Sequence, residues 1–134
     1  MPEQKTLKRA RKDKREGKAP STQAGEFVRE EIEQIREGKH GARSAKQAIA
    51  IGLSKARRAG VKLPPPKEGQ TSAQTRKAAA KAYRAGQQHP GKASSPARAR
   101  AARRRLKREP HAAASHTALS RQARSAAKRR RRAL

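Results

Sequence analysis

The sequence has no cysteine and no tryptophan, and it has one tyrosine and one phenylalanine among its 134 residues. The missing thiols exclude disulfide frameworks, thiolate zinc sites and cysteine nucleophiles. The scarcity of aromatic rings argues against nucleic-acid binding by stacking of unpaired bases. No apolar run approaches the roughly 18 residues that a membrane-spanning helix needs, so we expect no membrane span.

Large apolar residues are also scarce. Leu, Ile, Val and Phe make up about a tenth of the chain, whereas a highly charged chain below roughly 20% is expected to be disordered. Nine of the 15 large apolar residues lie within residues 27–63. The composition therefore predicts an all-α, largely disordered protein, in which one small helical hairpin is flanked by flexible basic arms with nascent Ala/Arg-rich helices.

The predicted hairpin covers residues 21–63 and begins with an acidic helix at about 22–37. This helix can start near Ser21 or Thr22, both good N-cap residues, and it stops at Gly38. It contains half of the ten acidic residues of the chain. Its core-facing side is a stripe at helical spacing that consists of Val28, Ile32 and Ile35.

The second helix of the hairpin is basic and is predicted at about residues 45–59. Ser44 and Gln47 have the spacing of a capping box, and Gly60 followed by Val61 has the pattern of a Schellman ending. The short connection at residues 38–43 favours antiparallel packing of the two helices. The face expected to meet the acidic helix consists of Ala45, Ala48, Ile49, Gly52, Leu53, Ala56 and Ala59.

Outside the hairpin, composition and turn residues divide the chain into four further segments. They are a basic N-terminal arm at 1–20, a Pro-rich linker at 64–71, an Ala-rich helix at 72–86 and an Arg/Ala-rich basic tail at 87–134. Two tail helices, starting at Ser95 and near Thr117, contain too few large apolar residues to dock on a core, so we expect them to fray in water. The hairpin alone buries little, and a homodimer or a bound polyanion is expected to complete it.

The charge balance indicates an anionic partner. The chain has 37 Lys and Arg against 10 Asp and Glu, a net charge of +27. Clusters of lysine and arginine bind phosphate backbones independently of the nucleotide sequence, because they release the counterions condensed on the nucleic acid. The predicted nucleic-acid-binding residues are Lys8, Arg9, Arg11, Lys12, Lys14, Arg15, Lys46, Lys55, Arg57, Arg58, Arg103, Arg104, Arg105, Lys107, Arg108, Lys128, Arg129, Arg130, Arg131 and Arg132.

No catalytic or metal-binding pattern accompanies these clusters. The histidines, at positions 40, 89, 111 and 116, are not joined by cysteines or by a carboxylate cluster. The glycines form neither a P-loop nor a dinucleotide fingerprint. We therefore expect no enzyme activity, no metal, no cofactor and no small-molecule substrate.

Three blocks of the sequence carry a resemblance. They are STQAGEFVREE at residues 21–31, GKHGARS at 38–44 and KQAIAIGLSKARRAGVKLP at 46–64. Together they resemble a family of small, highly basic bacterial proteins of uncharacterised function, some of which are labelled plasmid stabilisation or DNA-binding. The resemblance covers roughly residues 1–66 and implies a bacterial or phage origin, but it assigns no functional residue. The tail resembles histone-like tails in composition only.

These observations favour a sequence-non-specific DNA-binding protein of the cytoplasm and nucleoid, histone-like in character. It would neutralise phosphates and compact or bridge duplex DNA in plasmid or phage maintenance. Two alternatives stay open. One is a basic protein associated with RNA or the ribosome, and the other is an adaptor whose hairpin binds a protein partner.

Overall fold

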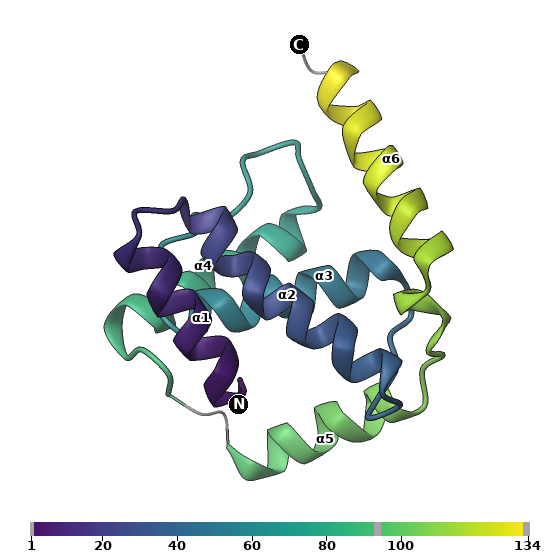
Figure 1. Cartoon of the computed structure of the whole chain (residues 1–134), viewed down its shortest axis with the longest axis horizontal. Coiled ribbons are helices and arrows are strands. Elements are labelled where there is room, and N and C mark those ends of the chain that lie inside the picture. Colours follow the sequence, from purple (N-terminus) through teal and green to yellow (C-terminus); the bar gives the residue numbers. More distant parts are fainter. Residues whose placement is uncertain (1, 93–94, 133–134) are drawn as a thin grey trace. The chain divides into compact units, whose positions relative to one another are not determined.

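The computed structural model describes residues 2–92 and 95–132, and in that part of the chain it contains helices and no strand (Figure 1). Residues 1, 93–94 and 133–134, which belong to the predicted arm and tail, lie outside the described residues. The elements are α1 (Gln4–Arg15), α2 (Pro20–Arg36), α3 (Ala45–Arg58), α4 (Ala73–Gln88), α5 (Pro96–Lys107), the short 3-10 helix η1 (Ala112–Ala114) and α6 (His116–Arg132). The all-α prediction is confirmed.

The prediction of a largely disordered chain with flexible arms is wrong. Helices cover most of the described residues, including α1 in the predicted arm and both α5 and α6 in the predicted tail. The prediction counted large apolar side chains, whereas most of the buried apolar residues are alanine. Alanine buries little area, but it lets helices approach until backbone atoms pack against each other. The buried alanines are Ala10, Ala24, Ala42, Ala45, Ala48, Ala56, Ala79, Ala82, Ala113 and Ala114.

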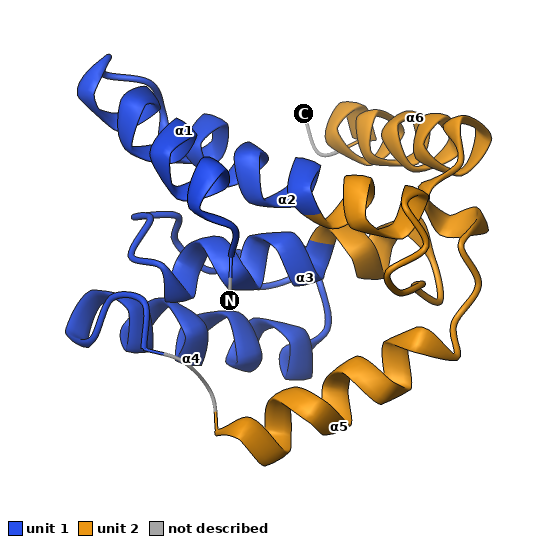
Figure 2. Cartoon of the chain, turned by 60° about the horizontal axis from the view of Figure 1, so that its bottom comes forward, with its two compact units in different colours: residues 1–30, 50–94 blue, residues 31–49, 95–134 orange. Residues whose placement is uncertain are grey.

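The chain forms two compact units, and each is assembled from two separate stretches of sequence (Figure 2). Unit 1 consists of residues 1–30 and 50–94, and unit 2 consists of residues 31–49 and 95–134. Both α2 and α3 therefore contribute residues to each unit. Each unit has a buried cluster of its own.

The core of unit 1 joins α1 to the hairpin. Phe27 of α2 is 1% exposed and lies in one buried cluster with Ala10 of α1, Ala24 of α2, Ala56 of α3 and Val61. Partly buried Leu7, Leu53, Ala59 and Leu63 pack against this cluster. The predicted basic arm thus supplies part of the burial that we expected from a homodimer, and the homodimer stays a prediction.

Gly52 sets the contact between α2 and α3 within unit 1. A Cβ at this position would lie 2.6 Å from Val28 Cα and 2.9 Å from Val28 N, so a larger residue requires a backbone shift. Ile49 and Leu53, which the sequence analysis placed at the interface, are only half-buried. The expected helix pairing is present, but its closest contact is made by glycine rather than by large side chains.

Helices α2 and α3 each end at a glycine with a positive φ. At the end of α3, Gly60 has a φ of +105°, its N–H donates to the Arg57 carbonyl at 3.1 Å, and the Val61 N–H donates to the Ala56 carbonyl at 3.1 Å. This pattern is the predicted Schellman motif, and it is confirmed. Gly38, with a φ of +79°, ends α2 in the same way.

The start of α2 differs from the prediction. The helix begins at Pro20 rather than at Ser21 or Thr22. The N–H groups of Thr22 and Gln23 donate to the Ala19 carbonyl at 3.0 and 3.1 Å. The correction has a physical reason, because the fixed φ of proline suits the first turn of a helix.

In unit 2, the connection between α2 and α3 pairs with the end of α5 and with the segment that follows it. The Gly41 N–H donates to the Leu106 carbonyl at 2.8 Å, and the Ala42 N–H donates to the Pro110 carbonyl at 3.0 Å. A Cβ at Gly41 would lie 1.9 Å from the Glu109 carbonyl oxygen, so the two backbones touch. This part of the predicted tail is therefore ordered against the connection.

The buried cluster of unit 2 also includes the predicted tail. Ala113 and Ala114 of η1 lie in one buried cluster with Ile35 of α2, Ala42 of the connection and Ala48 in the first turn of α3. The contact is made by η1 and not by the two predicted tail helices, because α5 and α6 have no buried residue. The docking of this segment between the two helices was not predicted. Alanines and backbone hydrogen bonds make the contact, and neither was counted when only large apolar residues were considered.

The close contact at Gly52 yields a prediction about stability. We expect Gly52→Ala to lower the free energy of unfolding by about 1–3 kcal/mol, because the added methyl group pushes α2 and α3 apart. The control is Gly25→Ala in α2, where a Cβ meets nothing within 4 Å. That change should raise the free energy of unfolding by about 0.5–1 kcal/mol. Thermal unfolding followed by circular dichroism measures both, and equal effects of the same sign would contradict the described packing.

Candidate nucleic-acid interface

Helix α1 has one buried face and one basic face. The buried face consists of Thr6, Ala10 and Asp13. At about 100° per residue, four exposed cations lie on the opposite face at the spacing i, i+3, i+4 and i+7. We call them the α1 basic stripe, and they are Lys8, Arg11, Lys12 and Arg15. Arg9 and Lys14, the remaining candidates on α1, are exposed at the flanks of the stripe.

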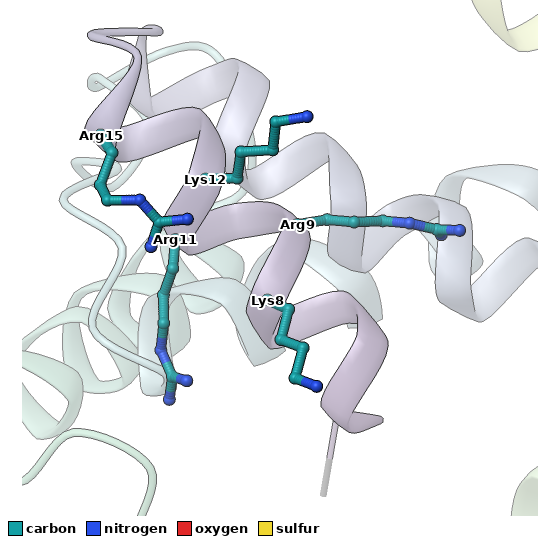
Figure 3. A pocket seen from close by; sticks show the side chains of 5 residues that line it. All are labelled: Lys8, Arg9, Arg11, Lys12 and Arg15. Carbon is teal, nitrogen blue, oxygen red and sulfur yellow. The ribbon is translucent and has the colours of Figure 1, made fainter.

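The stripe borders an open hollow on the surface of α1. Its lining residues are Lys8, Arg9, Arg11, Lys12 and Arg15, and Figure 3 shows their side chains fanning out from the helix. Several cations around one hollow can meet phosphate oxygens from different directions. All five lining residues are lysine or arginine, so this surface can neutralise the charge of an anionic partner.

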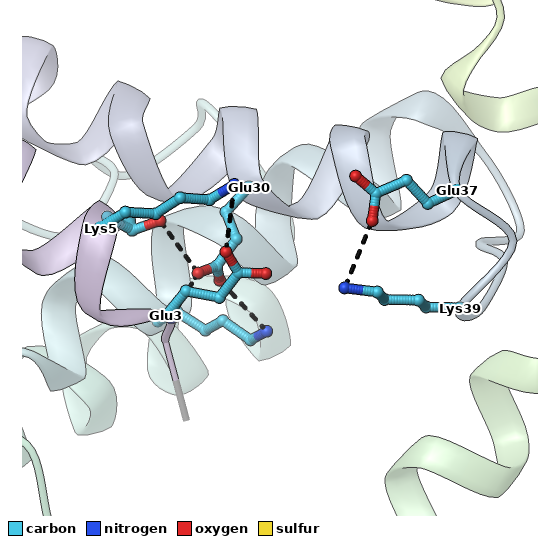
Figure 4. Close-up of polar contacts among 7 residues, drawn as sticks. Glu3, Lys5, Glu30, Glu37 and Lys39 are labelled. Carbon is cyan, nitrogen blue, oxygen red and sulfur yellow. Dashed lines mark hydrogen bonds and ion pairs between the residues drawn. The ribbon is translucent and has the colours of Figure 1, made fainter.

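Glu30 holds α1 on α2. Its carboxylate accepts hydrogen bonds from the backbone N–H of Glu3 and, at 3.0 Å, from the Thr6 hydroxyl (Figure 4). Lys55 Nζ lies 3.9 Å from Glu30 Oε2, and the Glu30 side chain is 2% exposed. Lys55, a candidate for binding nucleic acid, is thus engaged with a buried acid of its own unit.

Two further acidic side chains are buried. In unit 1, Asp13 lies 3.4 Å from Lys18 Nζ, and in unit 2, Glu31 lies 3.3 Å from His40 Nε2. Hydrogen bonds to Glu16 and then to Asp13 raise the pKa of Lys18. The buried carboxylates Asp13, Glu30 and Glu31 are therefore not at the surface, where they could compete with phosphate for the exposed cations.

Arg57 of α3 is buried, although the sequence analysis predicted that it binds nucleic acid. Its guanidinium donates to the carbonyls of Leu63 and Pro64 at 3.2 and 3.0 Å, and burial lowers its pKa. The helical period does not predict that Arg57 is buried, because its burial requires the segment after α3 to fold back so that the Leu63 and Pro64 carbonyls reach the guanidinium. Arg57 is therefore left out of the candidate interface, whereas Lys46 and Arg58 are exposed.

In unit 2, α5 and α6 have no buried residue, and all of their candidate cations are exposed. On α5, an open hollow is lined by Ala101, Arg104, Arg105 and Arg108. The other candidates in this unit are Arg103, Lys107, Lys128, Arg129, Arg130, Arg131 and Arg132. Within unit 2, the predicted residues thus lie exposed on α5, just after it and on α6.

Sequence reasoning missed a set of exposed cations on α4. They are Lys77, Lys81 and Arg84, at the spacing i, i+4 and i+7. The signal was present in the sequence, because this period puts all three on one helix face. They are separated along the sequence and do not form a dense cluster of adjacent basic residues, which is the pattern that indicated the other candidates.

In the part of the chain that the structure describes, we looked for two other features, a metal site and a membrane-spanning helix. No group of three or more His, Asp or Glu there could hold a metal ion. None of the described helices is long and apolar enough to cross a membrane.

The fold and the surface define a small, all-helical protein with cations displayed on its helices. Residues 3–68 match the model of a family of unknown function, DUF6496, which supports the resemblance to an uncharacterised family. The matched residues contain α1, α2 and α3, whereas α4, α5 and α6 lie outside them. Neither a curated protein nor a solved structure matches the chain. The labels of plasmid stabilisation and DNA binding stay predictions.

The anchoring role of Glu30 can be tested by mutation. We expect Glu30→Ala to lower the free energy of unfolding by about 1–3 kcal/mol, because it leaves buried donors of Glu3 and Thr6 without their acceptor. Limited trypsin digestion should then cleave within α1 faster, since the helix is less firmly held.

The matched control is Glu37→Ala. Glu37 lies 3.3 Å from Lys39 in an ion pair whose side chains are 55% and 56% exposed (Figure 4). Its removal should change the free energy of unfolding by less than about 1 kcal/mol and leave cleavage of α1 unchanged. If both substitutions accelerate cleavage equally, Glu30 is not the anchor of α1.

Proposed function

We propose that this protein binds the phosphate backbone of duplex DNA independently of sequence, as a histone-like, nucleoid-associated protein that compacts or bridges DNA in plasmid or phage maintenance. The observation that carries the proposal is the separation of charge between interior and surface. Asp13, Glu30 and Glu31 are buried, while the cations of α1, α5 and α6 are exposed. On α1, Lys12 Nζ lies 3.9 Å from the exposed Glu16 Oε1, and the other cations of the α1 basic stripe leave an excess of positive charge for a polyanion.

The cations lie on helices that are already folded, and this lowers the entropic cost of binding a polyanion. Lysine and arginine side chains release condensed counterions from DNA when they neutralise phosphates, and this release supplies most of the affinity of non-specific binding. On an ordered helix such as α1, the backbone does not have to be fixed at the moment of binding. Arginine additionally presents two N–H groups to one phosphate.

The aromatic residues favour a duplex over unpaired bases. Phe27 is 1% exposed in the core of unit 1, and Tyr83 on α4 is half-buried. Single-strand and sequence-specific RNA recognition relies on bases stacked against exposed rings. The two aromatic residues of this chain offer no such platform, whereas phosphate neutralisation needs none.

Salt dependence tests the proposed function directly. If the full chain contacts about ten phosphates, log K should fall with log salt at a slope of about −9 on duplex DNA. Fluorescence anisotropy between low and moderate salt measures this slope. A slope shallower than about −3, or tighter binding to RNA than to duplex DNA at matched salt, would contradict the proposal.

Charge-neutral variants locate the contacts. We expect K8Q/R11Q/R15Q to make the slope shallower by about 2–3, because each lost phosphate contact removes about 0.9 from it. The control, K62Q/K67Q/K92Q, removes the same charge from exposed positions outside the helices of unit 1. It should change the slope by less than about 1. Equal changes in both variants would show that net charge, rather than the α1 basic stripe, determines binding.

A further inference from the structure

Helix α4 has the same two-faced construction as α1. Ala79, Ala82 and Gly86 lie on one face and are buried. The opposite face carries Lys77, Lys81 and Arg84, which are exposed and which we call the α4 basic stripe. Because one face is packed and the other is exposed, the direction of the stripe is fixed within unit 1.

Helix α4 is held firmly against the end of α3. A Cβ at Gly86 would lie 1.6 Å from the Arg57 carbonyl oxygen, so the two backbones are in direct contact. Just after α4, the Gly91 N–H donates to the Arg58 carbonyl at 3.0 Å. These contacts turn the alanine and glycine face of α4 toward α3 and leave the α4 basic stripe pointing away from it.

The surroundings of the α4 basic stripe contain little negative charge. Residues 69–108 include no acidic residue. The carboxylate that pairs with α4 is Glu68, which lies 3.9 Å from Arg76 and is 92% exposed. The end of α3, against which α4 packs, adds the cation Arg58. A phosphate backbone that approaches this face meets an excess of positive charge, because Glu68 pairs with Arg76 rather than with a residue of the α4 basic stripe.

The two basic stripes of unit 1 lie on different helices, each on the side opposite the buried face of its own helix. The buried face of α1 lies against α2, because Thr6 and Glu3 donate to Glu30 and Ala10 joins the cluster of Phe27. Figure 2 shows α3 between α2 and α4 within this unit. Helix α1 also reaches α3, because Ala10 shares its cluster with Ala56, whereas α4 packs against the end of α3 through Gly86. The α1 and α4 basic stripes are therefore two separate surfaces on two helices.

We infer that unit 1 holds two duplex segments at once, one on the α1 basic stripe and the other on the α4 basic stripe. The inference rests on the proposed phosphate binding and specifies how one chain bridges DNA. Bridging then needs no second copy of the chain. The α4 basic stripe is the second phosphate-binding surface, and its partner is the backbone of a duplex.

A capture assay with the full chain tests the inference. A biotinylated duplex on beads is mixed with a fluorescent duplex and with the wild-type chain, K77Q/K81Q/R84Q or the control K62Q/K67Q/K92Q. Protein concentrations are chosen to give equal occupancy of a single duplex, and circular dichroism verifies equal helicity. We expect the α4 variant to capture at least fivefold less fluorescent duplex than the control, because one of the two binding faces is lost.

Lysine acetylation gives a second measurement that does not depend on a variant. Addition of duplex DNA should slow acetylation of Lys77 and Lys81 at least threefold, and Lys62 and Lys67 should stay as reactive as in the free protein. Equal capture by the α4 variant and the control, or unprotected Lys77 and Lys81 in a saturated complex, would overturn the inference while leaving DNA binding intact. Failure of the wild-type chain to bind a single duplex would overturn the proposed function itself.

Discussion

The close approach of small residues to neighbouring backbones is the constraint on which the rest of the structure depends. Gly52 touches Val28, Gly86 touches Arg57 and Gly41 touches the segment after α5. At such distances, backbone atoms and alanine methyl groups supply the packing that large side chains supply elsewhere. A chain with few large apolar residues can therefore have two buried clusters, and most of its remaining positions are free to carry charge.

This construction also explains the arrangement of charge. A net charge of +27 opposes a compact state by self-repulsion, and buried carboxylates inside the units offset part of that repulsion. Glu30 joins α1 to α2, and Asp13 and Glu31 hold Lys18 and His40. These three acids lie in the interior and do not reduce the positive charge on the exposed faces of α1, α4, α5 and α6. The same separation makes the surface suited to a polyanion, so stability and proposed function have a common cause.

Local features of the fold were predictable, because they depend on hydrogen bonds between near neighbours. Ser44 Oγ accepts the Gln47 N–H at 3.1 Å, and Gly60 ends α3 as its sequence indicates. The docking of η1 was not predictable, since alanine carries no signal of its distant partner. The candidate site divides in the same way. The cluster of cations at residues 8–15 was predicted from its charge, but the order of α1, which makes it a stripe, was not predicted. The inward turn of Arg57 depends on a long-range contact that no local pattern reveals.

The central claim is that the cations are carried on ordered helices before any polyanion is bound. Hydrogen exchange of the full chain without DNA, followed by mass spectrometry, measures this directly. The account predicts that amides in the middle of α1 and α4 exchange at least tenfold more slowly than in an unstructured chain, because they are hydrogen-bonded in packed helices. Exchange of these amides at the unstructured rate until duplex DNA is added would contradict it.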